Sequence, residues 1–276
     1  MRDVCQTQKY AQFMERYNWK HEWRRGNLFL FKRKFGLTFE TCYFPSKKLR
    51  SSDLQGNFCQ VECCDSKLPN PFACNWTHTV KIDLGRNIEE IWTSLRKHAR
   101  NAIRRSRDRG VWFRAGEEAD FDVFWKMYEY GAARQAFLTA RREILLDYLK
   151  TDFCRVFLVG IGDNTIGAYL VLEGEGVARY LCGGFSYTYQ HFRPNNLAHW
   201  DILEYYKNKG FSAYYMGTCG SDHKYGLYSF KTDFGKPVIT WNCKKANPFV
   251  EKMISLYRYL IDSRRSRPVL TSVPHS

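Results

Sequence analysis

The sequence lacks the features that mark membrane and secreted proteins. No apolar run approaches the roughly 18–20 residues that a membrane-spanning helix needs. The first segment, residues 1–19, is polar and contains no apolar signal-peptide core. Internal repeats and low-complexity segments are also missing. We therefore expect a cytoplasmic protein with no stable membrane insertion.

Several common catalytic motifs are missing as well. The chain has no serine-hydrolase elbow, no P-loop and no H-E-x-x-H metal motif. Its seven histidines are scattered, and His199 falls on a predicted helix, where packing explains it better than catalysis. Asp201 and Glu204 on the same helix are expected to face solvent. We expect no metal and no cofactor, and the sequence singles out no general base.

The ten cysteines do not form a standard zinc framework. Cys59, Cys63, Cys64, Cys74 and His78 lie in one stretch with the spacing C-x3-C-C-x9-C-x3-H, whereas structural zinc sites favour paired C-x2-C units. In a cytosolic protein most thiols are expected to be reduced. We therefore expect buried or incidental thiols in a small β-rich segment, with metal binding as the alternative.

Basic and aromatic residues are what the sequence has in excess. Its 276 residues include 43 lysines and arginines against 28 acidic residues, which gives a net charge of +15, and 17% of the residues are aromatic. This length allows one large domain or two small ones. A charge this positive favours a polyanionic partner, such as nucleic acid, a nucleotide-linked substrate or an anionic membrane surface.

Apolar periodicity predicts an α/β chain in which a first helix is followed by strands and then by alternating helices and strands. This order of elements is that of a mixed α/β acyltransferase-like unit. We expect helices over residues 6–18, 88–109, 119–131, 139–151, 197–209 and 247–262. Strands are expected over residues 27–33, 37–43, 58–63, 80–84, 111–113, 156–160, 165–172, 178–185, 213–216 and 237–242.

The helix after Asn87 carries a basic face. Asn87 is a good N-cap, Glu90 completes a capping-box pattern, and Gly110 fits the C′ position. Like charges three or four residues apart repel each other, and bound phosphates would relieve this repulsion. We therefore predict a contact with a phosphate-bearing ligand, the alternative being a solvated helix face. The predicted contact residues are Arg96, Lys97, Arg100, Arg104 and Arg107.

One lysine near the C-terminal end lies among aromatic and small residues. The segment Gly226–Gly235 reads G-L-Y-S-F-K-T-D-F-G. As an extended chain, it puts Leu227, Ser229 and Lys231 on one side. An ammonium in such surroundings is poorly hydrated, so its field acts strongly over short distances, as the stabilisation of an oxyanion requires. The alternative is a strand-end lysine that extends past its neighbours to water.

A glycine-rich loop for coenzyme A is missing. Acetyl-coenzyme-A enzymes of this α/β type carry a [Q/R]-x-x-G-x-[G/A] loop after their central strand. The matching place here, residues 190–197, reads Q-H-F-R-P-N-N-L and has no glycine. This argues against a standard pyrophosphate-binding loop at a helix N-terminus.

Three stretches, taken in order, form a more specific pattern than any one of them. They are Ile82-Asp83-Leu84 with the following E-E-x-W-x-x-L-x-K-x-x-R-N-x-I-R helix, Thr165–Leu170 through Gly184 with Pro194-Asn195-Asn196-Leu197, and Phe230-Lys231-x-x-Phe234-Gly235. Their combination resembles the FemABX family of aminoacyl-tRNA-dependent peptidyltransferases, and it covers roughly residues 80–245.

The resemblance implies a GNAT-like acyltransferase fold, often in two related halves, with a mixed twisted sheet flanked by helices. It implies an enzyme that moves an amino acid from charged tRNA to an amine of a peptide or nucleotide-linked peptide, usually the stem peptide of a peptidoglycan precursor. In relatives, the lysine of the F-K-x-x-F-G stretch is assigned to stabilising the tetrahedral intermediate. That residue is Lys231 here, and Phe230 matches the neighbouring aromatic residue.

The sequence departs from the family pattern at two places. The N-terminal part is shorter than a full GNAT-like half, so we expect a reduced subdomain over residues 1–80 and a transferase domain over residues 81–276. Where the family often has D-x-G-G, this chain has Tyr-Met-Gly-Thr at residues 215–218. A smaller acceptor site favours a peptide natural product or another small amine. The alternatives are an acyl-coenzyme-A-dependent N-acyltransferase and a non-catalytic RNA-binding module.

Overall fold

The computed structural model describes residues 2–34, 36–64, 67–68, 72–135, 139–220, 226–246 and 252. Apart from residue 252, the helix expected over residues 247–262 lies outside the described residues. Within them, no helix is long and apolar enough to cross a bilayer.

The described strands form one mixed sheet with eleven members, in the order β1-β2-β3-β4-β11-β5-β10-β9-β8-β7-β6. The mixed, twisted sheet flanked by helices is the fold class that the sequence predicts. The N-terminal strands are β1 (Lys20–Arg24), β2 (Asn27–Lys34), β3 (Leu37–Tyr43), β4 (Phe58–Cys64) and β5 (Ala73–Asp83). The others are β6 (Val111–Ala115), β7 (Cys154–Ile161), β8 (Asn164–Glu173), β9 (Val177–Phe185), β10 (Ala213–Gly220) and β11 (Pro237–Ala246).

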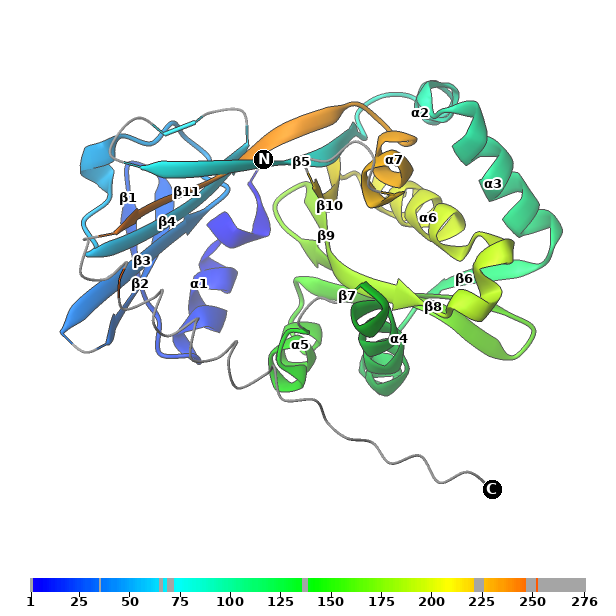
Figure 1. The fold of residues 1–276 in the computed structure, drawn as a ribbon, viewed down its shortest axis with the longest axis horizontal. Helices are drawn as coiled ribbons and strands as arrows, with labels where there is room; N and C mark the ends of the chain where they lie inside the picture. Colours follow the sequence, from blue (N-terminus) through cyan, green and yellow to red (C-terminus); the bar gives the residue numbers. More distant parts are fainter. Residues whose placement is uncertain are drawn as a thin grey trace.

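Helices cover both faces of the C-terminal strands (Figure 1). Alternation along β7 explains the two layers, because Phe157 and Val159 join the core under α6 while Val156 and Leu158 join the core under α4 and α5. The helices are α1 (Gln8–Glu15), α2 (Ile88–Ser94), α3 (Lys97–Asp108), α4 (Phe121–Gln135), α5 (Arg142–Leu149), α6 (Pro194–Asn208) and α7 (Gly226–Thr232).

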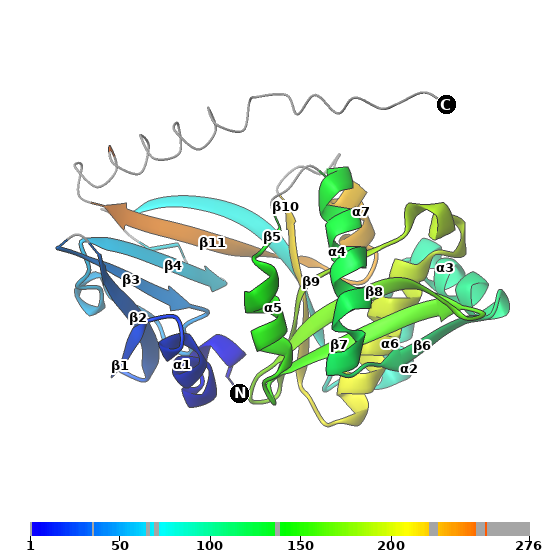
Figure 2. The same cartoon turned by 90° about the horizontal axis from the view of Figure 1, so that it is seen from below.

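The long strands β5 and β11 connect the two halves of the molecule (Figure 2). β11 follows α7 in the chain, yet it lies between β4 and β5 and pairs antiparallel with both. The predicted division between residues 80 and 81 falls within β5, so the two predicted halves share one continuous sheet. That the N-terminal half is reduced relative to the family stays a prediction.

The helix predicted over residues 88–109 is in fact two helices, α2 and α3. Asn87 caps α2 as expected, through a 3.0 Å hydrogen bond from the Glu89 amide to its side-chain oxygen. Leu95 and Arg96 then adopt extended backbone, and the Arg96 amide donates to the Asp233 carbonyl at 2.9 Å. The prediction of one helix was wrong because a tertiary hydrogen bond replaces an intrahelical one at this break.

The cysteine-rich segment contains a disulfide that the sequence did not predict. Cys74 on β5 and Cys243 on β11 are directly paired in the sheet and are joined by the disulfide. Cys59 is a buried thiol, as expected for this segment. No group of three or more His, Cys, Asp or Glu side chains that could hold a metal ion occurs among the described residues.

Candidate active site

The site lies where β9 and β10 separate. The two strands pair in parallel only where Ala213–Tyr215 meets Val177–Arg179, after which β9 continues beside β8 and β10 beside β5. The register of β10 shifts between Tyr215 and Thr218, as in a β-bulge. Gly217 in this bulge has a φ of +70°, and a Cβ there would lie 3.1 Å from the Tyr180 carbonyl oxygen. The bulge opens a space between the strands.

Lys231 reaches into this space from α7. The segment 226–232 is a helix, so the predicted extended chain was wrong, and helical spacing places Leu227, Phe230 and Lys231 on one side. Lys231 is only 3% exposed, and its Nζ donates to the Thr218 carbonyl at 2.7 Å. The lysine is therefore buried against the bulge and does not extend to water.

Burial changes the electrostatics of Lys231. Loss of hydration lowers the pKa of its ammonium to about 8, and the nearby Cys219 thiol opposes this shift. Nζ also lies 5.3 Å from the centre of the Tyr180 ring, where the negative face of the ring stabilises the cation. The site thus holds a poorly hydrated ammonium that is mostly protonated at neutral pH.

His199 contacts the same space as a neutral imidazole. Burial, followed by the charge of Lys231, lowers the pKa of His199 to about 3. Its Nδ1 lies 2.8 Å from the Tyr214 hydroxyl, and its ring centre lies 5.1 Å from that of Tyr180 and 5.6 Å from that of Phe230. His199 is packed, as the sequence predicts, but it also lines the cavity.

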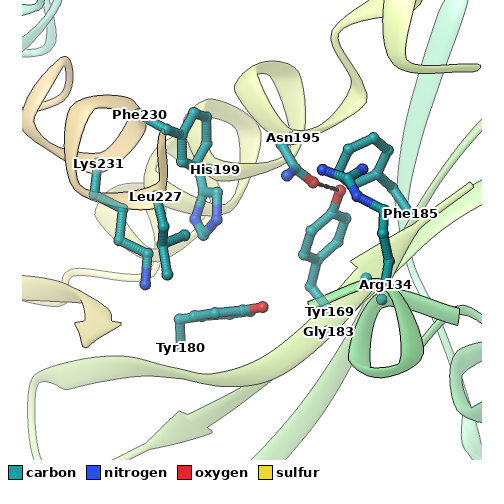
Figure 3. A pocket seen from close by; sticks show the side chains of 12 residues that line it. Arg134, Tyr169, Tyr180, Gly183, Phe185, Asn195, His199, Leu227, Phe230 and Lys231 are labelled. Carbon is teal, nitrogen blue, oxygen red and sulfur yellow. Dashed lines mark hydrogen bonds between the residues drawn. The ribbon is translucent and has the colours of Figure 1, made fainter. Parts of the chain in front are cut away.

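These side chains enclose an inner cavity of about 60 Å³. Such a volume holds a few water-sized groups. Figure 3 shows Lys231 and His199 at one end and Asn195 and Arg134 at the other, with Tyr180 between them. The Tyr169 hydroxyl donates to Asn195 Oδ1 at 2.5 Å. Tyr180 is a neutral phenol, because burial raises its pKa well above the usual value.

An open outer cavity of about 590 Å³ adjoins the inner one. The two share a neck to which α4, β9, α6 and α7 all contribute. Neither cavity has an aspartate or glutamate among its described lining residues. The neck residues are Arg134, Phe185, Asn195, Leu227 and Phe230. Residues that line only the outer cavity include Tyr187, Gln190, Arg193, Pro194 and Asn196.

Close packing of α4 on β9 brings Arg134 to this neck. A Cβ at Gly184 would lie 2.2 Å from the Met127 carbonyl oxygen, and one at Gly131 would lie 3.4 Å from the Gly184 Cα. Glycine at these positions lets the helix backbone approach the strand closely. The Arg134 guanidinium then lies 4.0 Å from the centre of the Tyr187 ring.

Arg104 and Arg107, two of the predicted phosphate-binding residues, contact other side chains of the protein. Arg107 forms ion pairs with Asp201 at 2.7 Å and Glu204 at 2.9 Å, so these two carboxylates are paired. Burial raises the pKa of Asp201 to about 6, although Arg107 opposes the shift. The Arg104 guanidinium lies 5.3 Å from the centre of the Trp92 ring.

The remaining predicted phosphate-binding residues lie at the start of α3. The Arg100 guanidinium donates to backbone carbonyls at the end of α2, and Arg96 lies 3.5 Å from Asp233. Lys97 is exposed. The structure thus places Arg96 directly before α3 and the other four basic residues on α3, and none of the five lines the inner or outer cavity.

Sequence reasoning did not assign a role to most of the cavity residues. Arg134 belongs to no motif that the sequence singles out, whereas Tyr169 and Tyr180 lie within the stretch from Thr165 to Gly184 that was part of the family resemblance. Asn195 falls in the Pro-Asn-Asn-Leu stretch of the same resemblance, and these two stretches were the available signal. Of the residues predicted to be catalytic, the structure brings Lys231 and Phe230 together in the inner cavity.

Comparison with known proteins supports the fold. A family model described as an acetyltransferase (GNAT) domain matches residues 93–225, which include β9, α6 and most of the cavity walls but not Lys231. No curated protein sequence matches the chain.

Solved structures share the architecture at low sequence identity. FemX has a TM-score of 0.68 at 14% identity, over 87% of this chain and 92% of FemX. L-PGS from Bacillus licheniformis has a TM-score of 0.56 at 11% identity, over 95% of this chain and 98% of that one. The C-terminal domain of a putative lysylphosphatidylglycerol synthetase from Agrobacterium fabrum has a TM-score of 0.57 at 10% identity, over 86% and 88%. The predicted GNAT-like α/β fold is therefore confirmed.

Proposed function

We propose that this protein is an aminoacyltransferase that moves an amino acid from charged tRNA to the amine of a peptide or peptidoglycan-precursor-like acceptor. The observation that carries the proposal is Lys231, a buried ammonium at the closed end of a cavity whose described lining residues include no carboxylate. Such a group is suited to stabilise negative charge that develops during acyl transfer. The likeness to FemX and to L-PGS in fold agrees with acyl-transfer chemistry but does not identify the donor.

The proposed reaction needs neither ATP nor a metal, because the ester of charged tRNA is already activated. The neutral acceptor amine attacks the ester carbonyl, and a carbon–nitrogen bond forms while negative charge builds on the carbonyl oxygen. Lys231 stabilises this oxyanion. The ester bond between the carbonyl carbon and the ribose oxygen then breaks, and the new amide is the product. The proton that the amine loses passes to the departing ribose oxygen.

The helix N-terminus beside the outer cavity favours this donor over acyl-coenzyme A. Pro194 begins α6 and has no amide hydrogen, while the amides of Asn196 and Leu197 already donate to the Arg193 carbonyl. Few backbone donors are therefore left to bind a pyrophosphate in the usual way. An acyl-coenzyme-A-dependent N-acyltransferase is the second candidate, and the family-model match to an acetyltransferase domain favours it.

The basic face of α3 is proposed to contact tRNA phosphates through Arg96, Lys97, Arg100, Arg104 and Arg107. Arg107 should contribute least, because a phosphate would have to displace its two carboxylate partners. A non-catalytic RNA-binding protein would use the same face without any transfer. The proposed location is the cytoplasm, where charged tRNA is available.

A donor-exchange assay tests the proposal. The purified full chain is incubated with an amine acceptor panel, including a nucleotide-linked stem peptide and short lysine peptides. The donor is either tRNA charged with a labelled amino acid or labelled acetyl-coenzyme A. We expect labelled amide product from charged tRNA alone. Product from acetyl-coenzyme A alone would establish the second candidate, and RNA binding without product from either donor would establish the third.

A further inference from the structure

Five cysteines share one face of the sheet where β3, β4, β11 and β5 run side by side. Cys42 and Cys243 are both paired with Val61, and Cys74 is paired with Cys243. Residues that are paired across strands lie on the same face, and so do residues two apart along one strand. The five cysteines pack in one apolar cluster and are Cys42, Cys59, Cys63, Cys74 and Cys243. The cluster therefore gathers half of the ten cysteines of the chain at one place.

Within this cluster the disulfide joins β5 to β11, and the environment of two other cysteines keeps them as thiols. The Cys59 Sγ donates to the Gly56 carbonyl at 3.2 Å, and burial together with the charge of Glu40 raises the pKa of this thiol to about 12. Burial raises the pKa of Cys42 to about 12 as well. Because the thiolate is the form that attacks disulfides, these two thiols are unreactive at neutral pH. Redox chemistry in the cluster is therefore directed to the bonded pair.

The Cys74 side chain fits the reduced state as well as the bonded one. Its Sγ lies 3.7 Å from the Leu68 carbonyl oxygen and 3.8 Å from that of Phe72, and a thiol can donate to either. Cys74 is half-buried and its neighbour Asn75 is exposed, whereas Cys243 is fully buried. A thiolate from solution can therefore attack the Cys74 sulfur, and reduction leaves that sulfur with hydrogen-bond acceptors.

The disulfide lies at the junction of the two halves of the molecule. β5 and β11 connect the halves (Figure 2), and the bond joins residues that are 169 positions apart in the chain. In β11 it lies toward Ala246, at the end away from α7, which carries Lys231. Closing so long a segment stabilises a protein by restricting its unfolded chain. The bond should therefore change stability strongly, while the hydrogen bonds between the strands hold the sheet together without it.

We propose that Cys74 and Cys243 form a site of reversible oxidation by low-molecular-weight disulfides, such as oxidised glutathione, and that the bond stabilises the junction of the two halves. As the bond forms, the two thiols lose two electrons and two protons, and oxidised glutathione is reduced to two glutathione thiols. In the reverse direction, a glutathione thiolate attacks the Cys74 sulfur and the Cys243 thiolate leaves. A second glutathione then releases Cys74 as a thiol and departs as oxidised glutathione.

The inference rests on the proposed function in one respect, the compartment. A compartment that holds charged tRNA is one whose glutathione keeps most thiols reduced. The bond then forms there only when the glutathione pool becomes oxidised.

Equilibration of the full chain in glutathione buffers tests the site. The buffers range from fully reduced to fully oxidised glutathione, after which thiols are blocked with iodoacetamide and the peptides are mapped by mass spectrometry. We expect Cys74 and Cys243 to be blocked separately in the reduced buffer and linked in the oxidised one. The thermal midpoint should be about 10 °C higher in the oxidised buffer, since native disulfides contribute stability of this order.

Matched variants locate the response. Cys74→Ala should abolish the difference in thermal midpoint between the two buffers, whereas Cys63→Ala removes another cysteine of the same cluster and should keep it. Cys243→Ala deprives the half-buried Cys74 of its thiol partner, so oxidised glutathione should form a mixed disulfide with Cys74. Cys74→Ala should give no such adduct on Cys243, which is fully buried.

Two results would overturn the inference: both cysteines blocked as thiols in the oxidised buffer, or linked peptides that persist in the reduced buffer. Both are read from the unmodified chain, so they do not depend on the folding of a variant. Transfer from charged tRNA combined with either result would reject the inference and keep the proposed function. A glutathione-dependent bond without transfer from any donor would reject the proposed function and keep the oxidation site.

Discussion

Two basic regions of this molecule differ in where their charges find partners. On α3 the arginines are numerous, but Arg96 and Arg107 form ion pairs and Arg100 bonds to backbone carbonyls. At the cavities there are few cations, yet Lys231 is buried and Arg134 has no carboxylate partner in the described chain. The many arginines along α3 are therefore weaker evidence for a reactive site than one buried lysine or one arginine without a carboxylate partner among the described residues.

The largest expected effect is the loss of the Lys231 charge. Lys231→Met keeps most of the side-chain volume but removes the ammonium, so turnover should fall by about 10²–10³, which corresponds to about 3–4 kcal/mol of transition-state stabilisation. The measurement is the initial rate of transfer, with circular dichroism and the thermal midpoint as checks of folding. Retention of a tenth or more of the activity would place the oxyanion elsewhere.

A matched pair of arginine variants tests the comparison directly. Arg134→Gln should lower kcat/KM by about 10–100-fold, because a charged hydrogen bond to substrate is worth about 1.5–3 kcal/mol, and it should leave stability unchanged. Arg107→Gln should leave activity nearly unchanged and lower the free energy of unfolding by about 1 kcal/mol through loss of its partly exposed ion pairs. Steady-state kinetics give kcat/KM, and urea unfolding gives the free energy of unfolding, for both variants. A loss of stability in Arg134→Gln together with a loss of activity in Arg107→Gln would refute the distinction between the two basic regions.

The pH dependence of turnover should follow the ionisation of Lys231. Its pKa is lowered to about 8 by burial, and the protonated form is the one that stabilises an oxyanion. Turnover should therefore fall as pH rises through about 8, and the pH–rate profile of kcat measures this. A rate that stays constant to pH 10 would show that the ammonium is not required.

Stability should change in the opposite direction over the same range. Between about 8 and the ordinary value of 10.5 the folded state has released the Lys231 proton while the unfolded state still binds it. Rising pH then favours the folded state. Urea unfolding across this range should show that the free energy of unfolding of the unmodified protein, taken relative to that of Lys231→Met, rises with pH.

The smallest effect is expected on the α3 face. Replacing both Arg100 and Arg104 by Gln should reduce the slope of log K for RNA binding against log salt by about 1.5, because each phosphate contact contributes about 0.7–0.9. Fluorescence anisotropy with labelled tRNA at several salt concentrations measures the slope. An unchanged slope would remove these residues from the RNA contact.

The sequence predicted the fold class and singled out Lys231, whose catalytic role stays a prediction, and the limits of what the sequence predicted have physical causes. The motif around Lys231 identified the residue, but local alternation predicted a strand where α7 forms, because the helix is stabilised by its packing on β5 and β10. The break before α3 depends on the Asp233 carbonyl, which is 137 residues away from Arg96. The cavity walls depend on where β9 and β10 separate, and no local pattern encodes that.

The single measurement that tests the central claim most directly is a single-turnover experiment with charged tRNA and acceptor, comparing the unmodified protein with Lys231→Met. Both proteins are saturated with charged tRNA, its binding is measured separately, and the formation of amide product is followed in time. The account predicts equal tRNA affinity and a product rate about 10²–10³ lower in the variant. Equal product rates, or no product from charged tRNA with the unmodified protein, would contradict it.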